Sequence, residues 1–543
     1  MAILFQSVTV LPMDGGRKVL RDCFVAVEEE RITHVGPTRP AGDFERVVDC
    51  AGLVMLPGFV NAHTHLPMTL MRGYGGGCDL HTWLNDYIFP AEARLDDKSV
   101  AAGTALGLAE MIASGVTCVA DMYDHCDAII GEILKAGLSA NIARGVTLFT
   151  DDYSFDTFPG CVETQELTRR WNGCNNGQIK VDACVHGEYT SRPALWKDMG
   201  AWARENNLGM HVHVSETRSE HRECRERWGK TPIQVLDEYG VWDCGRALAA
   251  HCVYTTPEDW AIMKEKHISC IHNPWSNLKL GSGVAPIPAM QKAGVNVALG
   301  TDGMSSHNSA DFFSDIKLAA VLHNGVGEDP SALSAWDALE MATVRGAAAL
   351  GRTDTGVIAP GKIADLILVD FTAPNLTPCH DEAENLVFAA HGSNVAMNMC
   401  RGRVIYEEGE FLTLDLEQIR AQVKEQLERH VPTPPSVAHG CGVGGTARAA
   451  CKVANCLFDR PRDCRVLTAQ ELKQMLKRLK DPSHSDLHLL LKAVPDRIHT
   501  IIPGLLALDT IARVYGLEDI TVSPSGVREG YLQEKILKGG QPS

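Results

Sequence analysis

The sequence contains no apolar run approaching the roughly 18 residues that a membrane-spanning helix requires. Its first residues, MAILFQSVTVLPMDGG, alternate like a strand and do not join a basic region to a long apolar one, so we predict no signal peptide. Basic residues are scarce, since 51 Lys and Arg face 68 Asp and Glu, and the formal net charge is -17. We therefore expect neither a membrane protein nor a general nucleic-acid binder, which needs cationic surface to replace the counterions around phosphate.

Cysteine pairs of the form C-x-x-C are also absent, although the chain has 18 cysteines. Scattered cysteines in a large chain without a secretory signal predict reduced thiols and a cytoplasmic location. Cys441, Cys451, Cys456 and Cys464 cluster, but their spacing does not match a zinc ribbon. The zinc deaminases that carry a P-C-x-x-C motif are excluded as well, because this motif is missing.

The chain has 543 residues, of which 45% are hydrophobic, and this length allows about two to four domains with large cores. Residues 1–56 alternate apolar and polar residues in short segments separated by Gly and Pro, and a similar pattern returns in residues 359–428. Two separated β segments flanking one large block predict a single small β-sandwich built from both flanks, with a closing helix after the second segment.

The block at residues 57–358 alternates strand and helix patterns. Its eight strand candidates are residues 53–65, 116–122, 138–147, 179–186, 209–215, 247–253, 267–273 and 295–302. Helical stretches such as KSVAAGTALGLAEMIASG and DWAIMKEK separate most of them. Eight such units over about 250 residues predict an α/β fold of the (β/α)8 TIM-barrel type. The alternative, a doubly wound open sheet, lacks a G-x-G-x-x-G after its first strand.

A Pro-rich segment, HVPTPPSVAHG, predicts a linker at residues 429–440. Residues 441–543 would then form a separate C-terminal α/β unit, with a helix around TAQELKQMLKRLK.

Histidines and acidic residues fall at the ends of the predicted barrel strands. They are His63 and His65 on the first strand, His186 on the fourth, His211, His213 and then Glu216 on the fifth, His251 on the sixth and Asp302 on the eighth. Reactive side chains of a (β/α)8 enzyme lie at these strand ends, so the set predicts an active site there. For any one of these residues alone, a hydrogen-bonded place in the core is the simpler interpretation.

His63 and His65 are two residues apart, so on a strand they point to the same face, which would be the barrel interior. Paired imidazoles suit a metal such as Zn or Fe, and a catalytic site needs about three protein ligands with an open position for water. His213 and Asp302 would complete the set. A divalent cation lowers the pKa of bound water, and Asp302 would accept the proton of that water.

His251 and Glu216 complete the predicted chemistry. His251 would orient the attacking hydroxide or stabilise the developing charge. Glu216 lies three residues beyond His213, where a carboxylic acid can donate a proton to a ring nitrogen and make the adjacent carbon more electrophilic. The alternative interpretation is that Glu216 is a solvated charged residue at the start of a helix.

The segment PGFVNAHTHLPMTLMRGYGGGCDLHTWLNDYIFPAEARL resembles the opening of the methylthioadenosine/S-adenosylhomocysteine deaminases of the amidohydrolase superfamily. HVHVSET, AAHCV, NPWSNLKLGSGVAPIPAMQKAGVNVALGTDG and PGKIADLILVD continue this match, which covers residues 1 to about 425. The resemblance implies a homo-oligomer that deaminates an adenosine-type nucleoside, such as 5′-deoxyadenosine, 5′-methylthioadenosine, adenosine or S-adenosylhomocysteine. It implies one divalent metal ion, with Zn²⁺ as the first choice and Fe²⁺ or Mn²⁺ as the alternatives. The implied ligands are His63, His65, His213 and Asp302.

The resemblance also implies catalytic roles for Glu216, His251 and Asp302, and a set of residues that bind the nucleoside. Trp83 would form an aromatic wall, and Glu92 would accept hydrogen bonds from both ribose hydroxyls. The remaining substrate-binding positions are Arg144, His186, Glu216 and Ser306.

Two segments depart from the family's pattern. Family members that accept S-adenosylhomocysteine often carry a second Arg after the strand of Arg144, which meets the amino-acid carboxylate. This chain has TLFTDDYSFDTFPG there, which is acidic and should repel a carboxylate. The segment HGEYT stands where the family commonly has a His-Ser-Pro-Tyr run. We therefore expect a preference for neutral 5′-substituents.

The C-terminal segments GVGGTARAACKV and PDRIHTIIPGLLALDTIARVYGLEDITVSPSGVREG resemble part of the exopolyphosphatase/guanosine pentaphosphate phosphatase family. The Gly-rich segment of that family lies near its phosphate site, where backbone N–H groups can bind anions. The rest of its actin-like fold is missing here, and Arg497-Ile498-His499 replaces the common R-A-D. We expect an inert or oligomerising appendage, with a phosphate- or nucleotide-binding module as the alternative.

Two other functions stay open. The same metal site could hydrolyse another heterocycle of the triazine, pyrimidine or guanine type, although Glu92 and Trp83 favour a ribose-bearing substrate. The chain could also be a phosphate- or nucleotide-sensing fusion protein whose barrel has lost its activity. The complete set of metal and catalytic residues argues against that loss, and metal content would distinguish the two cases.

Overall fold

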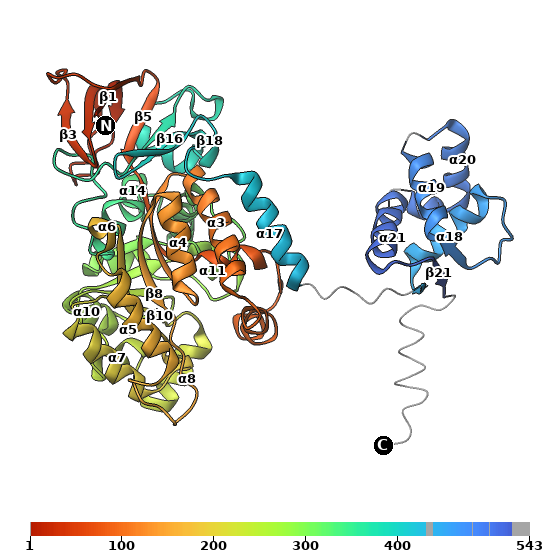
Figure 1. Cartoon of the computed structure of the whole chain (residues 1–543), viewed down its shortest axis with the longest axis horizontal. Coiled ribbons are helices and arrows are strands. Elements are labelled where there is room, and N and C mark those ends of the chain that lie inside the picture. Colours follow the sequence, from red (N-terminus) through yellow and green to blue (C-terminus); the bar gives the residue numbers. More distant parts are fainter. Residues whose placement is uncertain (1, 431–437, 481, 499, 524–543) are drawn as a thin grey trace. The chain divides into compact units, whose positions relative to one another are not determined.

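The structure is a computed structural model that describes residues 2–430, 438–480, 482–498 and 500–523 (Figure 1). It divides into two compact units, Met1–His430 and Val431–Ser543, each with a hydrophobic core. Within these described ranges, no helix is both long enough and apolar enough to cross a membrane.

Strands from both ends of the first unit form one nine-stranded sheet. They are β1 (Ala2–Val10), β2 (Leu20–Glu28), β3 (Arg31–Gly36), β4 (Arg46–Asp49), β5 (Leu53–Pro57), β15 (Leu366–Asp370), β16 (Val395–Cys400), β17 (Arg403–Glu407) and β18 (Glu410–Phe411). Their order is β18-β17-β16-β15-β5-β1-β2-β3, with β4 paired to β1. Because β5 and β15 are antiparallel neighbours, they join the two flanks of the chain.

Alternate residues of β5 and β15 face two different cores. Met55, Leu366 and Leu368 pack in the core that this sheet encloses, whereas Leu56 and Ile367 belong to the larger core of the barrel. Successive side chains of a strand point to opposite faces, so one sheet can serve both cores.

The middle of the first unit is a parallel barrel. Its strands are β6 (Phe59–His65), β7 (Val116–Tyr123), β8 (Ser139–Arg144), β9 (Ile179–Gly187), β10 (Met210–Val214), β11 (Ala247–His251), β12 (Ile268–His272), β13 (Val297–Leu299) and the short β14 (Asp302–Gly303). They pair in the order β13-β12-β11-β10-β9-β8-β7-β6-β14. The pairing of β14 with β6 closes the ring, because β14 directly follows β13 in the chain. The fold class expected from the sequence is thus confirmed.

The first predicted barrel strand, residues 53–65, is two strands in the structure. β5 belongs to the flanking sheet and β6 to the barrel, and Gly58 lies between them. A Cβ atom at Gly58 would lie only 2.2 Å from Cγ2 of Thr117, so the close approach requires glycine. Nearly every residue of both strands is buried, so no alternation of buried and exposed positions shows where the chain leaves one sheet and enters the other.

Helices connect and cover the barrel strands. In the first unit they are η1 (Leu66–Met71), α1 (Leu80–Thr82), η2 (Trp83–Ile88), α2 (Phe89–Glu92), α3 (Asp97–Ala113), α4 (Cys126–Ala136), α5 (Pro159–Trp171), α6 (Cys174–Gly177), η3 (Glu188–Thr190), α7 (Pro193–Glu205), α8 (Arg218–Trp228), α9 (Pro232–Glu238), α10 (Pro257–Glu265), α11 (Pro274–Lys279), α12 (Ile287–Ala293), α13 (Phe312–Gly327), α14 (Ala335–Ala342), α15 (Val344–Ala349), η4 (Pro374–Leu376), α16 (Glu382–Glu384), η5 (Asn385–Ala389), η6 (Gly392–Asn394) and α17 (Leu416–His430). The helix α3 begins where the Asp96 side chain accepts the Ser99 N–H at 2.9 Å, a standard N-cap. This helix and α10 correspond to the two helical stretches expected from the sequence.

The second unit combines a three-stranded sheet with helices. The sheet has the order β19-β21-β20 and consists of β19 (His439–Gly442), β20 (Val466–Thr468) and β21 (Asp519–Val522). The helices are α18 (Gly445–Leu457), α19 (Ala469–Leu479), α20 (His484–Ala493), η7 (Pro495–Arg497) and α21 (Ile501–Tyr515). Residues 431–437 of the expected linker, and His499 of the Arg-Ile-His segment, lie outside the described residues.

Candidate metal centre and active site

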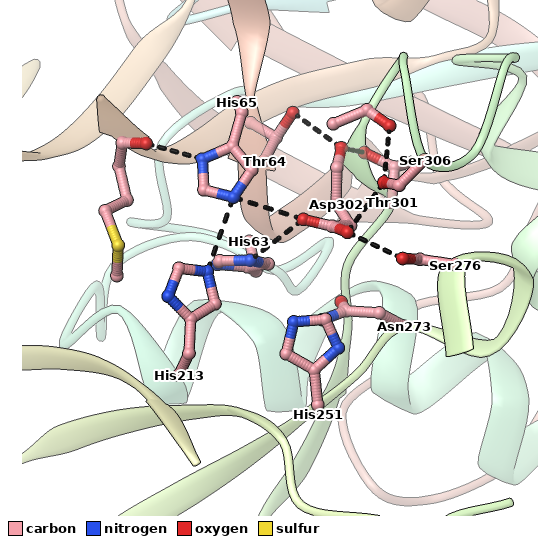
Figure 2. Close-up of polar contacts among 12 residues, drawn as sticks. His63, Thr64, His65, His213, His251, Asn273, Ser276, Thr301, Asp302 and Ser306 are labelled. Atoms are coloured by element: carbon pink, nitrogen blue, oxygen red, sulfur yellow. Dashed lines mark hydrogen bonds and ion pairs between the residues drawn. The ribbon is translucent and has the colours of Figure 1, made fainter. Parts of the chain in front are cut away.

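Four histidines and one aspartate come together at the C-terminal ends of the barrel strands (Figure 2). His63 and His65 end β6, His213 lies near the end of β10, His251 ends β11 and Asp302 begins β14. All five are buried. The φ angles of His251 and Asp302 are 75° and 62°, in the left-handed region that residues other than glycine rarely adopt. Such backbone strain persists only where the surrounding structure holds it, and it is frequent at functional sites.

The ligand atoms of this cluster are close together. His63, His213, His251 and Asp302 each offer one atom, and the four atoms lie within 4.8 Å of one another. His65 joins them, because its Nε2 lies 3.1 Å from Asp302 Oδ1 and 3.4 Å from His213 Nε2. Imidazole nitrogens and a carboxylate oxygen at such spacing are a suitable donor set for a divalent ion such as zinc.

Hydrogen bonds fix how the three histidines predicted as ligands point. Nδ1 of His65 donates to the carbonyl of Met122, and Nδ1 of His213 donates to the carbonyl of His186 at 2.8 Å. Nδ1 of His63 lies 2.9 Å from Nε2 of His211. The three Nε2 atoms are thus left to face the cluster. That of His63 is buried and lies 3.3 Å from Oδ1 of Asp302, but it has no hydrogen-bond partner in suitable geometry among the described residues. A metal ion would supply this partner, so these residues fit one.

The charges of His63, His213 and Asp302 suit a cation. Burial lowers the pKa of His63 to about 3, and burial likewise puts the pKa of His213 well below its usual value, so both imidazoles are neutral. Burial alone would raise the pKa of Asp302, but interactions with the neighbouring His63 and His65 lower this pKa well below its usual range. Neutral imidazoles and an ionised carboxylate are the forms that bind metal. His65 differs, because burial disfavours its charged form but the neighbouring Asp302 raises its pKa to about 9, so a metal ion would displace a proton there.

Two hydroxyl groups hold the other oxygen of Asp302. Oδ2 accepts hydrogen bonds from Ser276 Oγ at 2.6 Å and from Ser306 Oγ at 2.7 Å (Figure 2). Ser306, expected to bind substrate, is therefore placed beside Asp302, and it is not one of the residues that line the cavity described next. Its hydroxyl orients the carboxylate.

A cavity of about 320 Å³ opens onto the cluster. Its lining includes four of the clustered residues, which are His65, His213, His251 and Asp302. The other predicted site residues that line it are Trp83, Glu92, Arg144, His186 and Glu216. The structure thus brings the expected metal, catalytic and substrate residues to the lining of one cavity, except for His63 and Ser306, which do not line it.

Glu216 lies at the edge of the metal cluster. Its Oε2 atom is 3.8 Å from Nε2 of His251, and its Oε1 atom accepts a hydrogen bond from Ser282 at 3.4 Å. Burial raises the pKa of the Glu216 carboxyl, which favours the protonated form that can act as an acid. His251 is oriented by Asn277, whose Oδ1 lies 2.8 Å from His251 Nδ1.

Trp83 and Glu92 come from the segment that follows the first barrel strand. Trp83 begins η2 and donates its Nε1–H to the carbonyl of Tyr74 at 3.3 Å. Glu92 ends α2, where the neighbouring groups include the buried hydroxyl of Tyr123. Burial raises the pKa of Glu92 to about 7. A carboxylate acceptor on the wall of the cavity suits a polyhydroxylated part of a substrate.

Some residues of the site were not assigned from the sequence. His211 was recognised from the sequence among the strand-end residues but was given no role, although it precedes His213 by two residues and so shares its face of β10. Asn277, Ser276 and Tyr123 also contact site residues. These three come from β7 and from α11, and their spacing in the sequence carries no signal.

Known proteins are similar to this chain in sequence and in fold. A model of the amidohydrolase family matches residues 54–405, and one of the Ppx/GppA phosphatase family matches residues 401–539. The chain is 40% identical over 431 residues to a 5-methylthioadenosine/S-adenosylhomocysteine deaminase of Moorella thermoacetica, covering 79% of this chain and 99% of that protein. It is 41% identical over 416 residues to a 5′-deoxyadenosine deaminase of Methanothermobacter thermautotrophicus, covering 76% and 95%.

Solved structures include a similar protein with a metal. An adenosine deaminase of Xanthomonas campestris with bound zinc has 32% sequence identity and a TM-score of 0.74, and the match covers 79% of this chain and 98% of that chain.

Proposed function

Because this chain belongs to the amidohydrolase family, we propose that it is a metal-dependent deaminase that converts an adenosine-type nucleoside into the inosine analogue and ammonia. One observation carries the proposal: a single cavity opens onto the His/Asp cluster and is also lined by the buried acid Glu216, by Glu92 and by Trp83. Relatives named as deaminases of 5-methylthioadenosine, S-adenosylhomocysteine and 5′-deoxyadenosine give the substrate class.

One divalent ion would be held by His63, His65, His213 and Asp302. Zinc is our first choice because the similar Xanthomonas campestris structure contains it, and Fe²⁺ or Mn²⁺ would suit the same donors. When bound, the metal lowers the pKa of water and so supplies hydroxide near neutral pH. His251, although within reach of the cluster, faces Glu216 at 3.8 Å, and we assign it to the substrate side.

The protein's own residues move the protons. Glu216, protonated because it is buried, donates to the purine N1 and so makes the adjacent carbon C6 more electrophilic. Asp302 accepts one proton of the attacking water and passes it to the leaving amino group, which departs as ammonia. The proton left on the C6 hydroxyl returns to Glu216 as the carbonyl forms, so both carboxyl groups regain their starting states. His251, held by Asn277, stabilises the charge that develops at the attacked carbon.

The remaining lining residues bind the nucleoside. Glu92 accepts hydrogen bonds from the ribose hydroxyls, Trp83 packs against the nucleoside, and Arg144 and His186 line the walls. We also propose a homo-oligomer in the cytoplasm, as the family resemblance and the cysteine pattern imply. The C-terminal unit, which matches part of the Ppx/GppA phosphatase family, is proposed to be an inert or oligomerising appendage.

Incubation of the purified, metal-analysed protein with 5′-deoxyadenosine, 5′-methylthioadenosine, adenosine and S-adenosylhomocysteine tests the proposal. Deamination is followed by the ultraviolet change from adenine to hypoxanthine, with Glu216→Gln as the control. Turnover by the wild type that is lost in the variant supports the proposal. A metal-loaded protein that deaminates none of the four would contradict it.

A further inference from the structure

Arg144 is the cation that lines the nucleoside cavity, and two carboxylates already neutralise it. It ends β8, its Nη1 pairs with Asp124 and its Nε lies 2.6 Å from Oε2 of Glu163. The side chain of Arg144 is only 17% exposed, whereas those of Asp124 and Glu163 are 56% and 54% exposed. Asp124 also lines the nucleoside cavity, whereas Glu163 lines a neighbouring hollow and pairs with Arg144 from that side.

A second hollow of about 230 Å³ lies beside the first and shares Asp124, His125 and Arg144 with it. Two further acidic residues of this hollow have partners of their own: Asp97 lies 2.6 Å from Nδ1 of His125, and Asp127 lies 2.7 Å from Arg170. Glu166 also lines it. Asp124, Glu163 and Glu166 thus outnumber the single guanidinium of Arg144, and the local charge is negative.

The chemistry of the proposed reaction decides which part of a nucleoside meets this region. Carbon C6 of the purine must lie at the metal cluster, so N9 and the ribose extend away from it. Glu92 marks this direction, since it lines the same cavity as His65, Asp124 and Arg144. A 5′-substituent that extends beyond the ribose would then approach Asp124 and Arg144, which line this cavity.

We infer that Asp124 and Glu163 set the charge preference of the pocket for the 5′-substituent, so that cationic and uncharged groups are accepted and anionic groups are rejected. This inference rests on the proposed function, and it specifies the class of nucleoside by the charge of the 5′-substituent. Arg144 would attract an anion if it stood alone. Paired with two carboxylates it presents a net negative surface, which repels an anion and favours a protonated amine.

Three nucleosides that differ at the 5′-position test the inference: 5′-amino-5′-deoxyadenosine, 5′-deoxyadenosine and adenosine 5′-carboxylate. We expect kcat/KM to fall in this order, with the amine favoured over the carboxylate by about ten-fold or more at low salt. The ratio should shrink as ionic strength rises, because the carboxylates are half exposed and therefore screened. Equal values for the three, or a preference for the carboxylate, would overturn the inference.

Variants identify the residues responsible. Glu163→Gln and Asp124→Asn should each raise the ratio of kcat/KM for the carboxylate to that for 5′-deoxyadenosine by about three-fold or more, and the double variant should raise it further. Glu132→Gln on α4, which removes the same charge from a salt bridge with Lys135 outside the pocket, is the matched control and should leave the ratio unchanged. An unchanged ratio in the double variant would contradict the assignment to these residues.

The two proposals fail in different ways. Absence of deamination with all three probes would contradict the proposed function, whereas deamination without charge preference would contradict only the inference. Calorimetric binding of the same probes to the metal-loaded protein measures the charge preference without turnover, and a carboxylate that binds as tightly as the amine would overturn it.

Discussion

Oε2 of Glu216 and Nε2 of His251 lie 3.8 Å apart, so the proposed acid and the proposed charge-stabilising group face the same point in the cavity. Glu216 follows β10 and His251 ends β11, and these two strands are parallel neighbours in the barrel. Their pairing brings together two residues that are 35 positions apart in the chain. A purine ring between the cluster and Glu216 would present N1 to the acid and C6 to the nucleophile.

Replacing Glu216 by Gln should reduce kcat by about 10²- to 10⁴-fold, because an amide keeps the shape of the side chain but cannot transfer a proton. Steady-state kinetics with 5′-deoxyadenosine measures the loss. Metal content and melting temperature serve as controls, since neither should change. A variant that keeps more than a tenth of the wild-type kcat would rule out Glu216 as the proton donor.

Glu220 positions the segment that carries Glu216. Its Oε1 and Oε2 atoms accept the backbone N–H groups of Ser215 and Glu216, each at 2.7 Å. Glu220→Ala would leave these buried donors unpaired, at a cost of about 1–3 kcal/mol for each. We expect lower stability in urea and a lower kcat, with partial rescue of both in Glu220→Gln. Loss of stability without any loss of kcat would show that the segment needs no such support.

His211 should affect metal affinity without binding the metal. Its Nε2 lies 2.9 Å from Nδ1 of His63 and so keeps Nε2 of His63 directed at the cluster. Removing such an outer partner typically weakens metal binding by about 10- to 100-fold. Competition with a zinc chelator should show this loss for His211→Leu and a smaller one for His211→Gln, which retains a hydrogen-bonding group. Unchanged affinity in both variants would contradict the prediction.

Nucleoside binding should depend on pH through Glu92. Burial raises the pKa of this carboxyl to about 7, so it is protonated below that pH and ionised above it. An ionised carboxylate can accept hydrogen bonds from both ribose hydroxyls, whereas the protonated form loses acceptor capacity. We expect KM to rise as pH falls below about 7, while Glu92→Gln should have a high KM with little pH dependence near 7. A wild-type KM that is flat between pH 6 and about 8 would exclude this role.

The deaminase activity should be confined to the first unit. Every described residue that lines the cavity lies between His65 and Asp302, and the compact first unit extends to His430. A chain that ends at residue 430 should therefore keep kcat/KM within about two-fold of the full chain, because it retains the barrel and its core. Gel filtration of both chains would show whether the C-terminal unit contributes to oligomerisation. Loss of turnover in a folded, metal-loaded truncation would assign the C-terminal unit a part in catalysis.

Much of the barrel was predictable because strand and helix patterns alternate and because the reactive residues end the strands. His63 and His65 show this clearly: their spacing of two residues determines a shared face, and the barrel makes that face the interior. Trp83 and Glu92 have no such pattern. Their expected roles came from a family resemblance, and the structure places both on the cavity.

Other features were not predictable, since they depend on contacts between segments that lie far apart in the chain. Ser306 was expected at the substrate, but its hydroxyl bonds to Asp302, because the turn after β14 directs it behind the carboxylate. The division of residues 53–65 at Gly58 depends on the close approach of Thr117, which lies about 60 residues later.

The sequence by itself determined the alternation of strands and helices, the residues with metal-binding and acid–base chemistry, and the family. These properties depend on local periodicity and on residue type. Only the tertiary structure decided that Arg144 is paired with Asp124 and Glu163, because its partners stand 20 residues before it and 19 residues after it. An arginine at a substrate pocket suggests an anionic ligand until its neighbours are known, and the charge that a substrate meets is the sum over all groups that the fold brings together.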